Sequence, residues 1–305
     1  MKILVLGSGL MGPAAVFNAV SDPEVTQVVL CDVDPQQLEA ALKRFVGTAY
    51  AAKLGVVRLD LSRQDAAAQL MAKFDATVAA LPRSVSPLAI RAALQAGTPL
   101  VDLTRPSDEE VKTLGYAATA GGMIILGCGV EPGLTEIVAR HLAEKLDNID
   151  ELHIKCGGIP AVPVPPLGYK IVFGGRQLPL REQAGHMVEA GELKLAPRYS
   201  AIERVLFDGV GECEAWQENF MPWLLDLPAL QGLQIGTQKT VRWPGYAAKV
   251  TVLKEMGLLS QEPVLVEGVP VVPKQLLDAL LYPRVKLEEG EADITLLRVE
   301  VSGRR

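Results

Sequence analysis

Short apolar segments alternate with amphipathic ones through the first 130 residues of this chain of 305 residues. The apolar segments have the length of buried strands, and the amphipathic ones repeat apolar residues at the three- and four-residue spacing of a helix. We expect strands at residues 2–6, 27–31, 56–60, 76–80, 100–103 and 123–126, and helices at 10–21, 35–45, 62–73, 86–96 and 107–120. Strict alternation of this kind predicts an α/β domain with a doubly wound parallel sheet.

The pattern changes after residue 132, where a helix at 135–146 leads into a strand at 151–156. Further β-like segments are expected at residues 169–173, 202–207, 238–243, 263–266 and 292–301. We therefore expect two domains, 1–132 and 133–305, the second an α+β domain with a mixed, mainly antiparallel sheet. The segment 157–168 contains four prolines. Because proline is rarely found inside a strand, this segment is expected to be a stiff loop near the active cleft.

The composition is that of an ordinary globular protein, with 49% hydrophobic and 22% charged residues. A formal net charge of −6 argues against a nucleic-acid partner, which requires a basic surface. No apolar segment approaches the ~20 residues of a membrane span, and Met1 and Lys2 lead directly into the first strand without a leader. The four cysteines and three histidines are scattered. This pattern indicates reduced thiols, a cytoplasmic protein and no metal site.

A glycine motif follows the first expected strand. Gly7, Gly9 and Gly12 have the spacing G-x-G-x-x-G, with Leu10 and Met11 inside it and a helix directly after it. In the Rossmann fold the first glycine allows a tight turn, the second lets the backbone approach a pyrophosphate, and the third lets the helix pack against the strand. The helix N-terminus adds unpaired N–H groups and a partial positive charge. These five residues are therefore predicted to bind a dinucleotide.

An acidic residue, Asp32, stands at the end of the second expected strand, twenty residues after Gly12. An acid at this position binds the hydroxyl groups of the adenine ribose. Its carboxylate would repel a 2′-phosphate, and no Arg or Lys occurs in residues 33–37. The sequence therefore favours NAD over NADP, although Lys43 and Arg44 in the next helix could weaken that preference.

Turns that include polar residues follow the later strands of the expected sheet. Leu81 and Pro82 follow the fourth strand, Asp102 and Thr104 the fifth, and Glu131 lies in the turn after the sixth. In an open α/β sheet, ligands bind at the carboxyl ends of the strands. The first four residues are therefore expected near the nicotinamide. Asp102 is a candidate for holding a ribose or a catalytic water, and could equally be a turn residue.

Several elements of the second half occur together in an order that no general folding rule dictates. They are CGGIP at 156–160, PPLGYK at 165–170, GECEAWQENF at 211–220, KTVRWPGY at 239–246 and LKEMGLL at 253–259. With the glycine motif and the EPG turn at 131–133, they make the chain resemble the saccharopine dehydrogenase family, and within it the lysine 6-dehydrogenase-like members. The resemblance implies a nicotinamide enzyme that acts at a carbon–nitrogen bond of a lysine-type amino acid. It also implies a homodimer that forms through the second domain.

The resemblance implies roles for single residues of the second half, taken position by position. Arg242 matches the arginine expected to hold the substrate α-carboxylate, and Cys156 opens an element beside the cleft. Tyr169, Phe173 and Gly174 match a stretch that lines the substrate pocket, where relatives often have Trp and Ser at the last two positions.

The expected chemistry needs a general base, because the amine must lose a proton before hydride leaves the carbon and the imine must then be hydrolysed. Glu131 is the first candidate, since saccharopine-forming relatives have an acid in the same turn. It could instead be a carboxylate stabilised at a helix N-terminus. Cys156 is a second candidate, although a cysteine that ends an apolar strand is commonly a small buried residue. Arg242 could grip a carboxylate through its planar guanidinium, with Trp243 beside it as a wall of the pocket.

Three activities fit these residues: oxidative deamination of L-lysine to its 6-semialdehyde, the saccharopine dehydrogenase reaction, and a carboxynorspermidine-type reaction. A saccharopine substrate requires a second carboxylate clamp, for which Arg83, Arg105 and Arg176 are candidates. A non-catalytic NAD-binding sensor is the alternative from another class. Ser302 to Arg305 directly follow a strand-like segment. Since family members continue with a return strand and a helical segment, we expect a C-terminal return segment to be missing from this chain.

Overall fold

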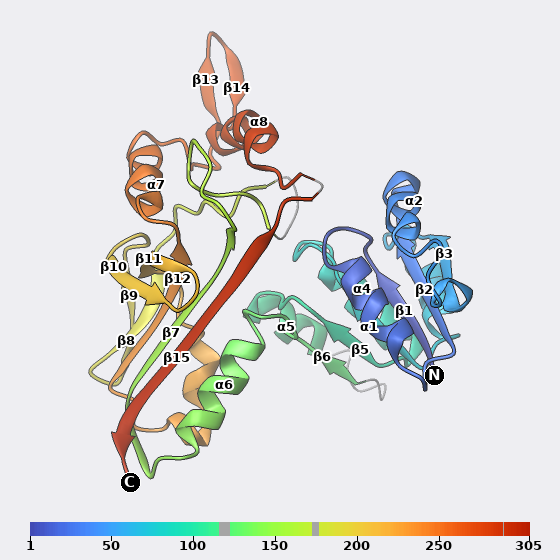
Figure 1. Ribbon diagram of the computed structural model, residues 1–305, viewed down its shortest axis with the longest axis horizontal. Helices are drawn as coiled ribbons and strands as arrows, with labels where there is room; N and C mark the ends of the chain where they lie inside the picture. Colours follow the sequence, from blue (N-terminus) through green and yellow to red (C-terminus); the bar gives the residue numbers. More distant parts are fainter. Residues whose placement is uncertain (116–122, 173–176, 289) are drawn as a thin grey trace. The chain divides into compact units, whose positions relative to one another are not determined.

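The computed structural model describes residues 1–115, 123–172, 177–288 and 290–305. The chain folds into two compact units, Met1–Leu134 and Thr135–Arg305, which divide just after the boundary expected from the sequence (Figure 1). Within the described residues no helix combines the length and the apolar character that crossing a membrane requires.

The first unit is built on a six-stranded sheet in the order β3-β2-β1-β4-β5-β6, in which every pairing is parallel. Its strands are β1 Lys2–Leu6, β2 Gln27–Asp32, β3 Leu54–Arg58, β4 Ala76–Ala79, β5 Leu100–Asp102 and β6 Ile124–Ile125. Its helices are α1 Gly12–Ser21, α2 Pro35–Lys43, the 3-10 helix η1 Ala51–Lys53, α3 Gln64–Met71, α4 Ser86–Ala96 and α5 Asp108–Gly115. This strand order is that of the Rossmann fold, and the predicted doubly wound sheet is confirmed.

Alternate side chains of the central strands form two cores, one on each face of this sheet. Leu4 and Leu6 of β1 pack with apolar residues of α3 and α4. Ile3 and Val5 of the same strand pack with residues of α1 and α2 on the opposite face. Strands buried on both faces read as continuous apolar segments in the sequence, which explains why they could be predicted.

The strand order reverses between β1 and β4, and the glycine motif lies at this point. The N–H of Gly7 donates to the Cys31 carbonyl oxygen of β2 at 2.8 Å, and the N–H of Ala80 donates to the Leu6 carbonyl oxygen at 2.8 Å. The turn after β1 is therefore tied to both neighbouring strands. In open α/β sheets the crevice at such a reversal is where ligands bind.

The second unit contains a seven-stranded sheet whose main order is β10-β11-β12-β7-β15, with β8 paired to β12 and β9 paired to β8. The strands are β7 Asn148–Pro160, β8 Gly185–Glu189, β9 Glu192–Ala196, β10 Glu203–Phe207, β11 Gly211–Gln217, β12 Ile235–Arg242 and β15 Asp293–Arg304, with a separate hairpin of β13 Val264–Val266 and β14 Val269–Val271. The helices are α6 Leu134–Ala143, η3 Pro222–Asp226, η4 Pro228–Leu230, α7 Tyr246–Glu255 and α8 Pro273–Val285. Only β12 and β7 pair in parallel among the described strands of this sheet, so the predicted mixed, mainly antiparallel sheet is confirmed.

The expectation of a loop at 157–168 is wrong for its first four residues. Residues 157–160 continue β7 and pair with residues 293–296 of β15, the two long strands that run side by side in Figure 1. A Cβ at Gly157 would lie 2.1 Å from the Val241 carbonyl oxygen, so the strand needs glycine there. Close backbone approach is a reason for glycine inside a strand, whereas the loop had been expected from the prolines of this segment. Of the strand expected at 169–173, the described residues 169–172 form one isolated bridge, between Ile171 and Lys286.

This sheet curls, so that its first and last strands in the order, β10 and β15, come into contact. Arg298 of β15 donates from Nη2 to the Leu206 carbonyl oxygen of β10 at 2.6 Å, and its guanidinium lies over the ring of Phe207 at 4.8 Å. A core that includes Ile159 and Val241 fills the inside of the curl. The outer face is covered at one end by α6, η3 and η4, and at the other by α7, α8 and residues 167–171 and 178–180.

The register of the strands places predicted site residues and a glutamate on this outer face. Thr240 of β12 pairs with Cys156 of β7 and with Trp216 of β11, and Arg242 pairs with Glu214. Paired residues project to the same side, and residues two apart along a strand share a face. Cys156, Trp216, Glu214 and Arg242 therefore lie on one face, at the end covered by α7.

Candidate functional site

The glycine loop of the first unit has the geometry that a dinucleotide requires. Gly7 has φ +91°, and a Cβ there would lie 2.4 Å from the Ala80 carbonyl oxygen. A Cβ at Gly12 would lie 1.9 Å from the Gly7 carbonyl oxygen. At Gly9, by contrast, no described atom lies within 4 Å of the Cβ position. Two glycines are thus required by internal packing, while the third leaves open space beside the backbone, where a pyrophosphate fits.

Helix α1 starts directly from this loop, at Gly12. Leu10 and Met11, in the loop itself, are 40% and 42% exposed. The first N–H groups of a helix lack intrahelical partners and carry partial positive charge, which favours a bound phosphate. The loop, its open side at Gly9 and the helix N-terminus together have the geometry of a dinucleotide-binding loop, and binding of a dinucleotide there stays a prediction.

The carboxylate of Asp32 lies beside the same loop. Its Oδ2 accepts hydrogen bonds from Ser8 N at 2.7 Å and Ser8 Oγ at 2.8 Å, and its Oδ1 accepts one from Asp34 N at 2.9 Å. Asp32 is half-buried. Its two hydrogen bonds with Ser8 fix the second residue of the glycine motif. Sequence reasoning missed Arg58, which stands directly opposite Asp32 on β3. Arg58 is the nearest cation by register, although its Nε donates to the Val33 carbonyl oxygen.

The residues predicted near the nicotinamide follow β4 and β5. Leu81 lies against the loop, with its Cδ2 3.2 Å from the position of a Cβ on Gly7, and Pro82 is exposed. Asp102 is fully buried: it accepts hydrogen bonds from the Ser86 hydroxyl and, at 2.8 and 3.0 Å, from the N and Oγ1 of Thr104. These contacts are those of a turn residue that holds β5 to α4. A role for Asp102 in catalysis stays a prediction.

Glu131 lies in a tightly closed turn between β6 and α6. A Cβ at Gly133 would lie 2.2 Å from the Gly129 carbonyl oxygen, and Gly129 N donates to the Pro132 carbonyl oxygen at 2.9 Å. The N–H of Cys128 donates to the Asp102 carbonyl oxygen at 2.8 Å, which ties this turn to β5. Glu131 is half-buried and stands three residues before the start of α6. The position suits both roles expected from the sequence.

In the second unit Arg242 is a buried residue, 4% exposed. Its Cζ lies 4.7 Å from the ring centroid of Tyr169 and 5.8 Å from that of Tyr246. Its Nη1 donates to the Val241 carbonyl oxygen at 2.8 Å and lies 2.9 Å from the position of a Cβ on Gly157. Among the residues that the structure describes, Arg242 has no ion pair and its Nε has no hydrogen-bond partner.

The two tyrosines belong to a connected group of buried aromatic rings. Tyr246 stacks on Trp216 with centroids 5.1 Å apart, and meets Tyr169 edge-on at 5.6 Å. The ring centroid of Tyr199 lies 5.9 Å from that of Trp216. Burial raises the pKa of Tyr169 above the usual tyrosine value, against the opposing charge of Arg242, and raises the pKa of Tyr246 further. These phenols therefore stay neutral near Arg242.

Other predicted substrate residues surround this group in part. Cys156 is buried on the same sheet face, and the indole Nε1 of Trp243 donates to the Pro160 carbonyl oxygen at 2.8 Å. This bond fixes Trp243 against the end of β7. Phe173 and Gly174 lie outside the described residues.

A second buried arginine was missed by sequence reasoning. Arg198 pairs with Glu218, and only 5% of its side chain is exposed. Arg181 lies 3.7 Å from the same carboxylate oxygen. The neighbour of Arg198 in the chain, Tyr199, has φ +66°, a conformation that large side chains rarely adopt. No sequence pattern identifies the Arg198–Glu218 pair, because the two residues lie in separate loops that only the folded chain brings together.

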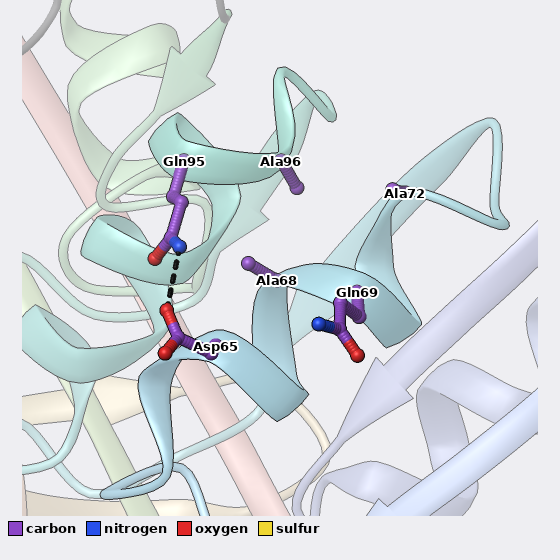
Figure 2. A pocket seen from close by; sticks show the side chains of 6 residues that line it. All are labelled: Asp65, Ala68, Gln69, Ala72, Gln95 and Ala96. Atoms are coloured by element: carbon purple, nitrogen blue, oxygen red, sulfur yellow. Dashed lines mark hydrogen bonds between the residues drawn. The ribbon is translucent and has the colours of Figure 1, made fainter.

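Figure 2 shows a pocket between α3 and α4 of the first unit. Its lining residues are Asp65, Ala68, Gln69, Ala72, Gln95 and Ala96. Half of them are alanines, and the Asp65 carboxylate already accepts a hydrogen bond from Gln95 Nε2 at 2.9 Å. None of the predicted site residues lines it.

The fold and the glycine loop define a dinucleotide-binding protein of the Rossmann class that carries a second, mixed-sheet domain. The family model "Saccharopine dehydrogenase NADP binding domain" matches residues 3–126, and "Saccharopine dehydrogenase C-terminal domain" matches residues 129–305. The chain belongs to the saccharopine dehydrogenase family.

Individual relatives are distant. The chain is 24% identical over 295 residues to a saccharopine dehydrogenase [NADP(+), L-glutamate-forming] of Pyricularia oryzae, an alignment covering 88% of this chain and 61% of the relative. It is 22% identical over 296 residues to the protein of the same name from Saccharomyces cerevisiae, covering 92% and 63%. The apo structure of the saccharopine dehydrogenase (L-Glu forming) from that yeast matches with a TM-score of 0.78 at 16% identity, over 98% of this chain and 80% of that one. The chain thus spans less than two thirds of the length of both curated relatives.

Proposed function

We propose that this protein is a nicotinamide-dependent dehydrogenase that acts on a carbon–nitrogen bond of a lysine-type amino acid. The reaction is either the oxidative deamination of L-lysine to its 6-semialdehyde or the related saccharopine dehydrogenase reaction. The names of the relatives support this chemistry, and the family model supports a pyridine nucleotide as the cofactor.

The observation that carries the proposal is the state of Arg242. A buried guanidinium with no ion pair among the described residues is costly unless an anion joins it. The α-carboxylate of an amino acid is such an anion, and a planar guanidinium can bind it through two parallel hydrogen bonds. Tyr169 and Tyr246 hold the plane of the guanidinium by contact with their rings. Arg242 therefore orients the substrate by its carboxylate end.

We propose NAD as the cofactor. Gly7, Gly9 and Gly12 would hold the pyrophosphate at the start of α1, and Asp32 would accept hydrogen bonds from the adenine ribose. A carboxylate at this position disfavours a 2′-phosphate, and it stays in place because Ser8 and Asp34 bind it. Arg58 is the residue most able to offset that preference. Bound NAD supplies a hydride acceptor at its nicotinamide ring.

A residue of the chain must also accept a proton from the substrate. The substrate ammonium has to lose a proton before its lone pair can assist hydride loss, and water must then attack the imine. We assign the proton acceptor to Glu131, whose turn is fixed by Gly129 and Gly133 and tied to β5. Cys156 and Asp102 are the other candidates, and the contacts of Asp102 favour a structural role for it.

We further propose that the protein is a homodimer, as the family resemblance implies, and that it is cytoplasmic, as the scattered cysteines indicate. Sedimentation analysis of the purified chain tests the dimer, which a single monomeric species would contradict.

A substrate panel tests the proposed reaction. L-lysine, L-ornithine, saccharopine and diamines are each mixed with NAD or NADP, and formation of the reduced nicotinamide is followed by its absorbance. We expect turnover with an amino acid that has an ε-nitrogen, released ammonia with lysine, and preference for NAD. Tight NADH binding without turnover of any amine would instead support the sensor alternative.

A further inference from the structure

Glu214 is a buried carboxylate that the proposed chemistry does not use. It is 4% exposed and stands on β11, directly opposite Arg242 in the register of the sheet. Directly opposed residues of antiparallel strands have Cα atoms about 4.5–5.5 Å apart and side chains on the same face. A glutamate and an arginine so placed would ordinarily form an ion pair.

Glu214 instead binds the backbone at the start of α7. Its Oε2 accepts a hydrogen bond from Gly245 N at 2.7 Å, and its Oε1 accepts one from Ala247 N at 2.6 Å. Helix α7 receives no side-chain cap from its own N-cap residue, which is Gly245 with φ +89°. The carboxylate therefore satisfies two N–H groups that the helix itself leaves unpaired, and it favours the positive end of the helix dipole.

The residue between these two N–H groups is Tyr246. Its ring stacks on Trp216 and its centroid is 5.8 Å from the Arg242 Cζ. Glu214 thus holds the turn that places one of the two rings against the guanidinium. It also supplies a negative charge near Arg242 without pairing with it, because both of its oxygens are bound to α7.

We propose that Glu214 is a positioning residue for substrate recognition. Because its carboxylate caps α7, it fixes the position of Tyr246, and it does not form an ion pair with Arg242. The Arg242 guanidinium therefore stays directed at the substrate carboxylate. This inference rests on the proposed function, because it takes Arg242 as the group that binds the α-carboxylate.

The test compares two substrates that differ only in the carboxylate. L-lysine and cadaverine, its decarboxylated form, are assayed with NAD on the full chain and on Glu214→Gln, which keeps the size of the side chain but replaces one acceptor oxygen by a donor. The ratio of kcat/KM for lysine to that for cadaverine should fall about tenfold or more, mainly through a higher KM for lysine, because misplacement of a binding group by a fraction of an ångström has effects of this size. Activity with cadaverine should change little.

The matched control is Glu203→Gln on β10. Its carboxylate pairs with Lys239 at 2.9 Å and Lys155 at 3.6 Å, on the opposite face of the same sheet. This variant should lose some thermal stability and keep the wild-type substrate ratio. If Glu214→Gln lowers activity with both substrates equally, or lowers only the melting temperature as Glu203→Gln does, the proposal is overturned and Glu214 is purely structural. If the wild-type chain itself shows no preference for lysine over cadaverine, Arg242 does not bind the carboxylate of lysine, and the lysine reaction of the proposed function fails together with this inference.

Discussion

The guanidinium of Arg242 lies over the ring of Tyr169, its Cζ 4.7 Å from the ring centroid, and both side chains are buried in the second unit. A cation above an aromatic face is attracted by the ring quadrupole, and the attraction grows when water is excluded. This contact leaves the edge of the guanidinium, where its N–H donors point, for hydrogen bonding. Nη1 of Arg242 donates to the Val241 carbonyl oxygen, while its Nε has no hydrogen-bond partner among the described residues. An arginine held by its face with such a donor at its edge is suited to bind a carboxylate.

The three glycines of the nucleotide loop should respond differently to the same substitution. Gly12→Ala would place a Cβ 1.9 Å from the Gly7 carbonyl oxygen, so the loop must shift, and we expect a loss of about 1–3 kcal/mol in the free energy of unfolding. Gly9→Ala meets no described atom within 4 Å, so its stability should stay near that of the wild type. Its affinity for the dinucleotide should nevertheless fall about tenfold or more, because the methyl group occupies the space of the pyrophosphate.

Urea denaturation and titration with NADH separate these two effects. Gly55→Ala is a suitable control, since a Cβ there makes only an ordinary contact of 3.6 Å with Val29 on β2. If Gly9→Ala binds NADH as tightly as the wild type, the dinucleotide does not pass over this loop.

Asp32 should control which cofactor is used. Asp32→Asn removes the negative charge but retains an oxygen that can accept from Ser8, so the loop should stay folded. We expect the Kd for NAD to rise about tenfold, from loss of charge-assisted hydrogen bonds to the ribose, and the Kd for NADP to fall. Adding Arg58→Ala should remove the gain for NADP, because Arg58 is the cation opposite this position. A wild-type chain that already prefers NADP would contradict the assignment of NAD.

The buried tyrosines predict loss of stability in alkali. Burial raises the pKa of Tyr169 and Tyr199 above the usual tyrosine value, and that of Tyr246 well above it. The folded state therefore favours the neutral phenols. The stability they contribute is fully present below the unfolded tyrosine pKa of about 10 and is lost as the pH rises through the folded values.

Melting temperatures measured from about pH 8 to about pH 11 test this prediction. The fall in melting temperature should be smaller in Tyr169→Phe, which has one group fewer to ionise. An equal fall in the variant and the wild type would show that these phenols do not govern the alkaline transition.

Much of the first unit could be predicted because its chemistry is local. Gly7, Gly9 and Gly12 are close in sequence, and each is required by a contact within its own turn or with the next strand. Strands buried on both faces appear as apolar segments, and Asp32 follows one of them directly. The predicted Rossmann sheet was therefore confirmed.

The site of the second unit was harder to predict from the sequence, because the register of the paired strands brings its residues together. Arg242 was identified only through a sequence resemblance, and its opposition to Glu214 depends on how β11 pairs with β12. The prolines of the segment 157–168 predicted a loop, whereas β7 continues to Pro160 and Gly157 lets Val241 approach closely. Contacts between residues distant in sequence leave no periodic signal, so the roles of Glu214 and of the Arg198–Glu218 pair could not be predicted.

The most direct test of the account is the carboxylate dependence of Arg242. Steady-state kinetics with L-lysine and cadaverine are measured for the wild type, Arg242→Ala and Arg242→Lys. The KM for lysine should rise tenfold or more in Arg242→Ala, from loss of a charge-assisted interaction of about 1.5–3 kcal/mol, and only partly recover in Arg242→Lys, which keeps the charge without the planar fork. The constants for cadaverine should stay close to those of the wild type. An unchanged KM for lysine in Arg242→Ala would contradict the account at its centre.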